Sequence, residues 1–135
     1  MTEFLNLPDL LKLIDDLNVG PVRDLGLLES AVARPQTKLW GNEAYDNLDL
    51  KAAALLESIV RNHALVDGNK RLGWLATVVF FAINDVTIEG DDDEIYDTVI
   101  DTACGKISLE DLSAKLTSWH QDNGSQNEKY PKTLR

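Results

Sequence analysis

Nine consecutive residues, from His63 to Arg71, hold most of the groups in this sequence that could do chemistry, and they read HALVDGNKR. An imidazole changes charge near neutral pH, so His63 can accept a proton from a hydroxyl group. Asp67 offers a hard carboxylate oxygen, a ligand that suits magnesium bridged to phosphates. Lys70 and Arg71 place two cations within one helical turn, and a guanidinium can hold phosphate oxygens with two parallel hydrogen bonds. This set of groups indicates phosphoryl or nucleotidyl transfer, which depends mainly on positioning and charge neutralisation.

Gly68 and Asn69 lie between the carboxylate and the two cations, where a helix is expected to begin. The free N–H groups of a helix N-terminus bind anions, and the helix dipole strengthens that binding. Gly68 allows the backbone to approach a phosphate closely, and Asn69 can cap the helix and donate a hydrogen bond. The stretch is not a phosphate-binding P-loop, because the preceding glycine and the following Ser/Thr are missing.

Each of these residues also has an ordinary structural explanation. A histidine at a helix end is more often a C-terminal cap than a catalyst, Asp-Gly-Asn is a common turn, and surface Lys and Arg are usually only solvated. Against this, two cations in the first turn oppose the helix dipole, and the helix that follows is the most apolar in the chain. Residues that go against a local structural preference, next to a buried element, are typical of functional sites. The residues alone leave both explanations open.

The hydrophobic periodicity around this segment predicts an all-α fold. Apolar residues recur at helical spacing, and Gly, Pro or capping residues interrupt them. Leu55, Ile59 and His63 follow one another at i, i+4, so the histidine should end an apolar helix face. The segment 35–47 has no clear period and is expected to be a loop or a short extended hairpin. The expected helices span residues 8–17, 24–34, 49–62, 69–83, 91–104 and 108–119.

The helix expected at 69–83 is apolar nearly all round, which predicts that it forms the buried centre of the bundle. Its apolar run from Leu72 to Ile83 has 12 positions, whereas a membrane span needs about 20, so no membrane segment is expected. The N-terminus lacks the pattern of a signal peptide. We expect one domain over residues 1–120 and a polar, disordered tail over 121–135.

Composition narrows the classes of function. The chain has 135 residues, 13 Lys+Arg against 23 Asp+Glu, and a formal net charge of −10. Such a charge disfavours DNA binding by this chain alone, because non-specific binding depends on neutralising phosphates. The single cysteine, Cys104, excludes an internal disulfide and a Cys-rich zinc site, so a reducing, cytoplasmic location is expected.

The segment 63–71 resembles the signature of the Fic/Doc family, H-x-F-x-D/E-G/A-N-G/K-R. It is most similar to the death-on-curing (Doc) branch, which has Lys where most Fic proteins have the second Gly. The earlier stretch 26–36, GLLESAVARPQ, also resembles the opening of Doc-like proteins. The similarity extends over about residues 7–119. It implies a compact Fic-type helical bundle, with the signature joining two central helices, and a toxin from a toxin–antitoxin pair.

The resemblance also implies roles for the signature residues. His63 would be the general base that deprotonates a target hydroxyl, and Asp67 would hold magnesium. Asn69 would contact a phosphate, Gly68 would lend backbone N–H groups, and both Lys70 and Arg71 would bind and neutralise the phosphates. The segment 35–47 would correspond to a flap over the site, where a target peptide docks. No inhibitory Ser/Thr-x-x-x-Glu helix lies near the signature, so inhibition would depend on a separate Phd-like antitoxin.

The sequence leaves three functions open. Lys70 favours a kinase that transfers the γ-phosphate of ATP or another nucleoside triphosphate to a threonine of elongation factor Tu, which would stop translation. An AMP transferase has the same fold with the opposite nucleotide polarity, and there the small second Gly leaves room for the phosphates. The third hypothesis is a catalytically silent antitoxin-binding module. It rests on Leu65, which replaces the usual Phe and would anchor the loop less firmly.

Overall fold

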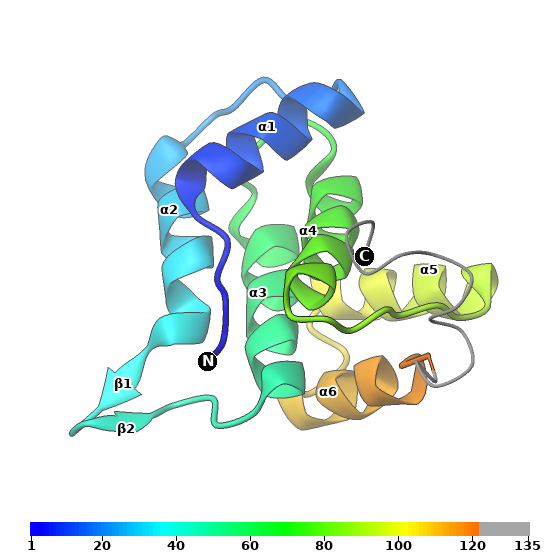
Figure 1. The fold of residues 1–135 in the computed structure, drawn as a ribbon. Coiled ribbons are helices and arrows are strands. Elements are labelled where there is room, and N and C mark those ends of the chain that lie inside the picture. Colours follow the sequence, from blue (N-terminus) through cyan, green and yellow to red (C-terminus); the bar gives the residue numbers. More distant parts are fainter. Residues whose placement is uncertain (122–135) are drawn as a thin grey trace.

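The computed structural model describes residues 1–121, and this part of the chain is built almost entirely of helices (Figure 1). A 3-10 turn, η1, and a small antiparallel hairpin lie between α2 and α3, and the hairpin pairs Lys38 with Glu43 and Leu39 with Asn42. The all-α prediction is confirmed, and each expected helix is present. The elements are α1 (Leu7–Leu17), α2 (Leu25–Ala33), η1 (Arg34–Gln36), β1 (Lys38–Leu39), β2 (Asn42–Glu43), α3 (Leu48–Asn62), α4 (Asn69–Ile83), α5 (Asp92–Ala103) and α6 (Leu109–Ser118).

Short polar residues define where the helices begin. Five of the six α-helices in residues 1–121 have an N-cap side chain that accepts a hydrogen bond from a backbone N–H in the first turn. These caps are Asn6, Asp24, Asn47, Asp91 and Ser108. The exception is α4, where Gly68 occupies the N-cap and no side chain caps the helix. The first turn of α4 therefore keeps backbone donors that the other helices satisfy locally.

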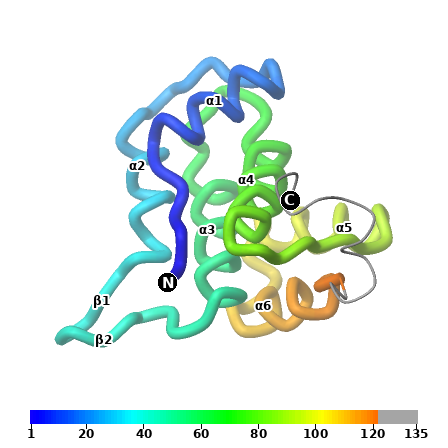
Figure 2. The backbone as a smooth tube through the Cα atoms, in the orientation of Figure 1, coloured from blue at the N-terminus to red at the C-terminus, as the bar shows by residue number. Residues whose placement is uncertain are grey.

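Helix α3 lies at the centre of the bundle and packs against α2, α4, α5 and α6 (Figures 1 and 2). Its buried side chains include Ala52, Ala53, Ala54, Leu55, Leu56, Ile59 and Val60. Gly73 lets α4 approach closely, because a Cβ there would lie 2.6 Å from Cγ1 of Val60. This contact brings together the two helices that the signature joins.

Helix α4 shares the centre of the bundle but is not covered on every side. Phe80 and Phe81 are fully buried, whereas Trp74 and Val78 are only half-buried and line an apolar groove of about 620 Å³ beside α5. The all-round apolar pattern thus overestimated the burial of one face of α4. Within residues 1–121 no helix combines the length and the apolar character that a membrane span requires.

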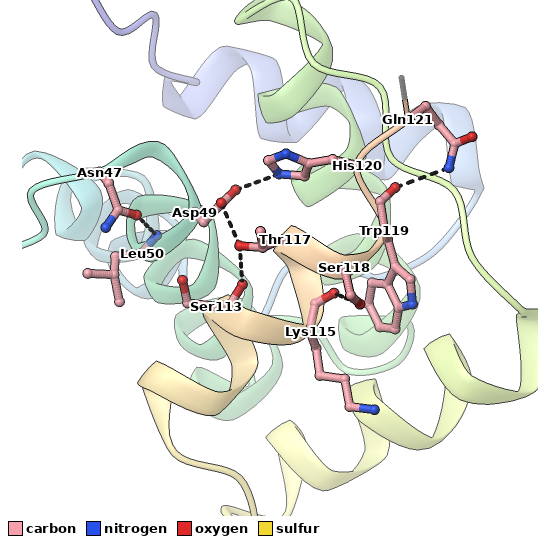
Figure 3. A network of polar contacts seen from close by, with 10 residues as sticks. All are labelled: Asn47, Asp49, Leu50, Ser113, Lys115, Thr117, Ser118, Trp119, His120 and Gln121. Carbon is pink, nitrogen blue, oxygen red and sulfur yellow. Dashed lines mark hydrogen bonds and ion pairs between the residues drawn. The ribbon is translucent and has the colours of Figure 1, made fainter. Parts of the chain in front are cut away.

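The described chain ends in polar contacts with α3 (Figure 3), with α5 and with the segment between α4 and α5. Asp49, in the first turn of α3, accepts a hydrogen bond from Thr117 Oγ1 at 2.7 Å and lies 2.7 Å from Nε2 of His120. Trp119 is buried, and its indole N–H donates to Glu94 at 2.6 Å. Gln121 donates its backbone N–H to the carbonyl of Thr87 at 2.9 Å. The ordered domain thus includes Gln121, and the rest of the tail predicted to be disordered lies outside the described residues.

Two truncated chains should show how much these C-terminal contacts stabilise the fold, independently of the residues beyond Gln121. Ending the chain after Gln121 keeps every contact described above and should leave the melting temperature nearly unchanged. Ending it after Ser118 removes the buried indole of Trp119 and should destabilise the fold by about 3–5 kcal/mol. Thermal denaturation followed by circular dichroism measures both. Equal melting temperatures for the two truncated chains would show that the C-terminal contacts do not stabilise the bundle.

Candidate active site

His63 is the C-cap of α3, and Gly68 is the N-cap of α4, so only four residues lie between the two caps at the site. The backbone of His63 is left-handed, with φ 54° and ψ 46°. This conformation ends α3 and turns the chain toward α4. The structure thus places the histidine at the helix end that the periodicity predicted, and it leaves the side chain exposed.

The loop between the two helices is anchored by Leu65 and Asn69. Leu65 is 1% exposed. Its backbone N–H donates to Oδ1 of Asn69 at 3.0 Å, and its carbonyl accepts from Nδ2 of the same side chain at 2.9 Å. Leucine therefore fills a core position in the loop, and the looser anchoring expected of it relative to Phe stays a prediction.

These two bonds give Asn69 a role that the sequence did not predict. Its carboxamide braces the loop rather than pointing freely into solvent, with one amide hydrogen left for another acceptor. The phosphate contact of Asn69 stays a prediction, now assigned to that hydrogen or to the backbone N–H.

Substitution of Asn69 should weaken the fold, because Asn69→Ala leaves the N–H and the carbonyl of buried Leu65 without their partner. The expected loss in the free energy of unfolding is about 1–3 kcal/mol. Asn62→Ala is the matched control, since Asn62 makes one longer bond, 3.4 Å, to the carbonyl of Leu27. Urea denaturation measures both variants. A loss for Asn69→Ala no larger than for Asn62→Ala would contradict the bracing role.

The connection between α1 and α2 supports the same loop from its other side. The N–H of Gly20 donates to the carbonyl of Asp67 at 3.0 Å, and the N–H of Val66 donates to the carbonyl of Pro21 at 2.9 Å. Val22 and Leu65 form an isolated antiparallel bridge. The sequence indicated only that Gly20 and Pro21 stop a helix. Nothing local in it pointed to pairing with a segment more than 40 residues away.

All six residues predicted for the site line one cavity of about 310 Å³. The lining consists of His63, Asp67, Gly68, Asn69, Lys70 and Arg71, together with Val60 and Val66. The imidazole, the carboxylate and the two cations are thus brought together at the uncapped start of α4. Such a concave site, rich in donors and positive charge, is suited to a phosphate-bearing ligand.

The charges around the cavity act on one another. Nη2 of Arg71 lies 3.4 Å from Oδ2 of Asp67, one helical turn away, and both side chains are largely exposed. An exposed pair of this kind is weak, so either group can exchange its partner for a ligand at little cost. Lys70 and Arg71 both lie in the first turn of α4, where their charge opposes the dipole and reinforces the attraction for an anion.

The donor set decides which metal the site could hold. Asp67 is the one carboxylate in the cavity lining, and residues 1–121 contain no cluster of three or more His, Cys, Asp or Glu side chains that could hold a metal ion. A cage made by the protein alone is therefore absent from this part of the chain. Magnesium fits, because it is commonly bound through one or two carboxylates and takes its other ligands from water and substrate phosphates.

The hairpin is not a flap over this cavity, and that expectation is wrong. It precedes the N-terminus of α3, at the opposite end of that helix from the loop that joins α3 to α4 (Figure 1). No residue of 35–47 lines the cavity. A 15-residue helix is about 22 Å long at the usual rise of about 1.5 Å per residue. The hairpin and the cavity therefore lie at opposite ends of α3.

Charged contacts fix the hairpin to α3 instead. Lys51 is buried and donates to the carbonyl of Tyr45, and Arg34 binds Glu57 at 2.9 Å and the Tyr45 hydroxyl at 2.8 Å. Burial alone would lower the pKa of Arg34, but its hydrogen bonds to Tyr45 and Glu57 raise it above the ordinary value. Tyr45 is thus held against the protein, whereas Trp40 at the turn is 97% exposed.

Comparison with known proteins agrees with this geometry. Residues 4–81 match the model of the Fic/DOC family, and this range contains the whole of α3, the loop and the start of α4. The chain belongs to the Fic/DOC family. It is also 44% identical over 123 residues to a protein named Toxin Doc from Mycolicibacterium smegmatis, an alignment that covers 88% of this chain and 95% of that protein. Such coverage extends the likeness well beyond the nine-residue signature.

Proposed function

We propose that this chain is a toxin of the Doc type that transfers the γ-phosphate of a nucleoside triphosphate to a protein hydroxyl. One observation carries the proposal: an imidazole, a carboxylate and two cations line a single cavity at the uncapped N-terminus of α4. Membership of the Fic/DOC family and the 44% identity to a protein named Toxin Doc support it. The proposed target is a threonine of elongation factor Tu, and the proposed location is the cytoplasm, with a Phd-like antitoxin as partner.

The residues of the cavity suit each step of such a transfer. The hydroxyl proton of the acceptor moves to the imidazole of His63. The hydroxyl oxygen forms its bond to the γ-phosphorus while the bond to the β,γ-bridging oxygen breaks, and a nucleoside diphosphate leaves. Lys70, Arg71 and the free N–H groups of α4 stabilise the negative charge on the phosphate oxygens. Asp67 would hold magnesium, which when bound neutralises phosphate charge.

Lys70 distinguishes phosphate transfer from AMP transfer, the alternative reaction on this fold. It lies in the first turn of α4 and lines the cavity, where its side chain adds a charge and fills space that a glycine would leave open. Leu65, the residue that suggested a catalytically silent module, is buried, and its backbone N–H is bonded to Asn69.

Lys70→Gly should show whether the lysine favours phosphate transfer over AMP transfer. We expect it to lower γ-phosphate transfer by about 10²–10³-fold, because one charge-stabilising donor is lost, and to permit AMP transfer. The assay incubates the protein with magnesium, elongation factor Tu and ATP labelled in either the α- or the γ-phosphate. Lys70→Met is the control that removes the charge but keeps the bulk, and it should gain no AMP transfer. Label from α-labelled ATP with the unmodified chain would refute the kinase and support the AMP transferase.

A further inference from the structure

The backbone of His63 is held from outside its own helix by one side chain. Nη2 of Arg23 donates a hydrogen bond to the carbonyl of His63, across 40 residues of sequence. The next carbonyl, that of Ala64, accepts the backbone N–H groups of Arg23 at 2.7 Å and of Asp24 at 3.1 Å. Two consecutive carbonyls that emerge from the end of α3 are thus bonded to the α1–α2 connection.

These bonds matter because His63 is in a conformation that its residue type does not favour. A left-handed backbone costs a non-glycine residue roughly 1–2 kcal/mol, and φ here is 54°. The carbonyls of the last turn of a helix also lack partners within the helix, and a cation is favourable at this end of the dipole. The guanidinium of Arg23 supplies both the missing donor and the positive charge.

We propose that Arg23 is a positioning residue, which keeps His63 left-handed and thereby directs its imidazole toward the cavity. If His63 adopted the right-handed conformation, α3 would continue by one residue, and the imidazole would leave its place beside Asp67 and Lys70. Arg23 does not line the cavity. Its main-chain bond to Ala64 remains after any side-chain substitution, so the loop stays attached when the guanidinium is removed.

Nuclear magnetic resonance can observe this effect without any assay of activity. The chain has two histidines, His63 and His120, and the second lies in the polar network of Asp49 and Thr117. Labelling histidine with ¹⁵N and ¹³C therefore gives one signal set at the site and one internal reference. Substitution of His120 by Gln assigns the two sets.

Arg23→Met removes the donors but keeps most of the apolar stem. We expect the ring and backbone signals of His63 to shift or broaden while those of His120 stay in place. Arg23→Lys, which restores a cationic donor, should return the signals of His63 toward their original positions. Lys12→Ala removes an exposed cation from α1 as the matched control and should change neither set. Unchanged His63 signals in Arg23→Met would overturn the proposal, whatever reaction the chain catalyses.

A kinetic measurement adds a second test, which rests on the proposed phosphoryl transfer. Misplacement of a catalytic group lowers turnover, so Arg23→Met should reduce kcat by about 10–100-fold and leave KM for ATP within about twofold. A raised KM with unchanged kcat would show that Arg23 binds the nucleotide, and the positioning role would be lost. An unmodified chain that transfers no phosphate would refute the proposed function alone, because the resonance experiment still decides the role of Arg23.

Discussion

Replacing His63 with asparagine should lower phosphoryl transfer by about 10²–10⁴-fold, the usual contribution of a general base. Asparagine is the appropriate substitution because it tolerates the left-handed backbone of this position and carries no group that takes up a proton near neutral pH. The side chain of His63 is exposed, so its loss should change the free energy of unfolding by less than about 0.5 kcal/mol. Transfer from γ-labelled ATP and thermal denaturation measure the two effects.

His120→Asn is the matched control for this substitution. It also removes an imidazole, but one that binds Asp49 at the other end of α3. We expect this variant to lose some stability and to keep its transfer activity. Full activity in His63→Asn would contradict the assignment of His63 as the general base. Equal losses of transfer activity in the two variants would show that the effect comes from lost stability.

Gly68→Ala should destabilise the protein by about 2–5 kcal/mol, although the family signature accepts either Gly or Ala at this position. Two costs add. The backbone of Gly68 has φ +96°, where an L side chain is strained, and a Cβ would lie 2.4 Å from Cβ of Val19. In this chain Val19 occupies the space that the alanine methyl would need. Chemical denaturation of the purified variant measures the loss.

A double substitution separates the backbone strain at position 68 from the steric contact with Val19. Val19→Gly removes the side-chain atoms that the new methyl would meet, which lie 2.4, 2.5 and 3.1 Å away, and leaves the backbone strain at position 68. Combining Val19→Gly with Gly68→Ala should therefore cost at least about 1 kcal/mol less than the sum of the single effects. Additive effects would show that the contact with Val19 does not restrict this position.

Local signals predicted the helices and the composition of the site. Asp91 and Ser108 have the side chains that cap helices, and the structure uses them in that way. Asn69 to Ile83 are the bounds of α4 that the apolar pattern indicated. The site residues were identifiable because they lie within nine positions, and a segment this short, folded as helix end, loop and helix start, keeps its members close together.

The parts that depend on distant pairing were not predictable in this way. The bridge between Val22 and Leu65 joins segments whose sequences contain no sign of each other. A loop or a short hairpin was predicted over residues 35–47, but its place in the fold depends on contacts of Arg34 and Lys51 with partners in other elements. Asn69 was expected to face a phosphate, whereas its Oδ1 and Nδ2 atoms are hydrogen-bonded to the buried backbone of Leu65.

We propose that the groups around the 310 Å³ cavity transfer a terminal phosphate to a protein hydroxyl. Mass spectrometry of cell extract after expression of the chain, beside an extract with His63→Asn, tests it most directly. With the unmodified chain, and not with the variant, a threonine of elongation factor Tu should gain the mass of one phosphate. An added mass of AMP, or the same modification in both extracts, would contradict it.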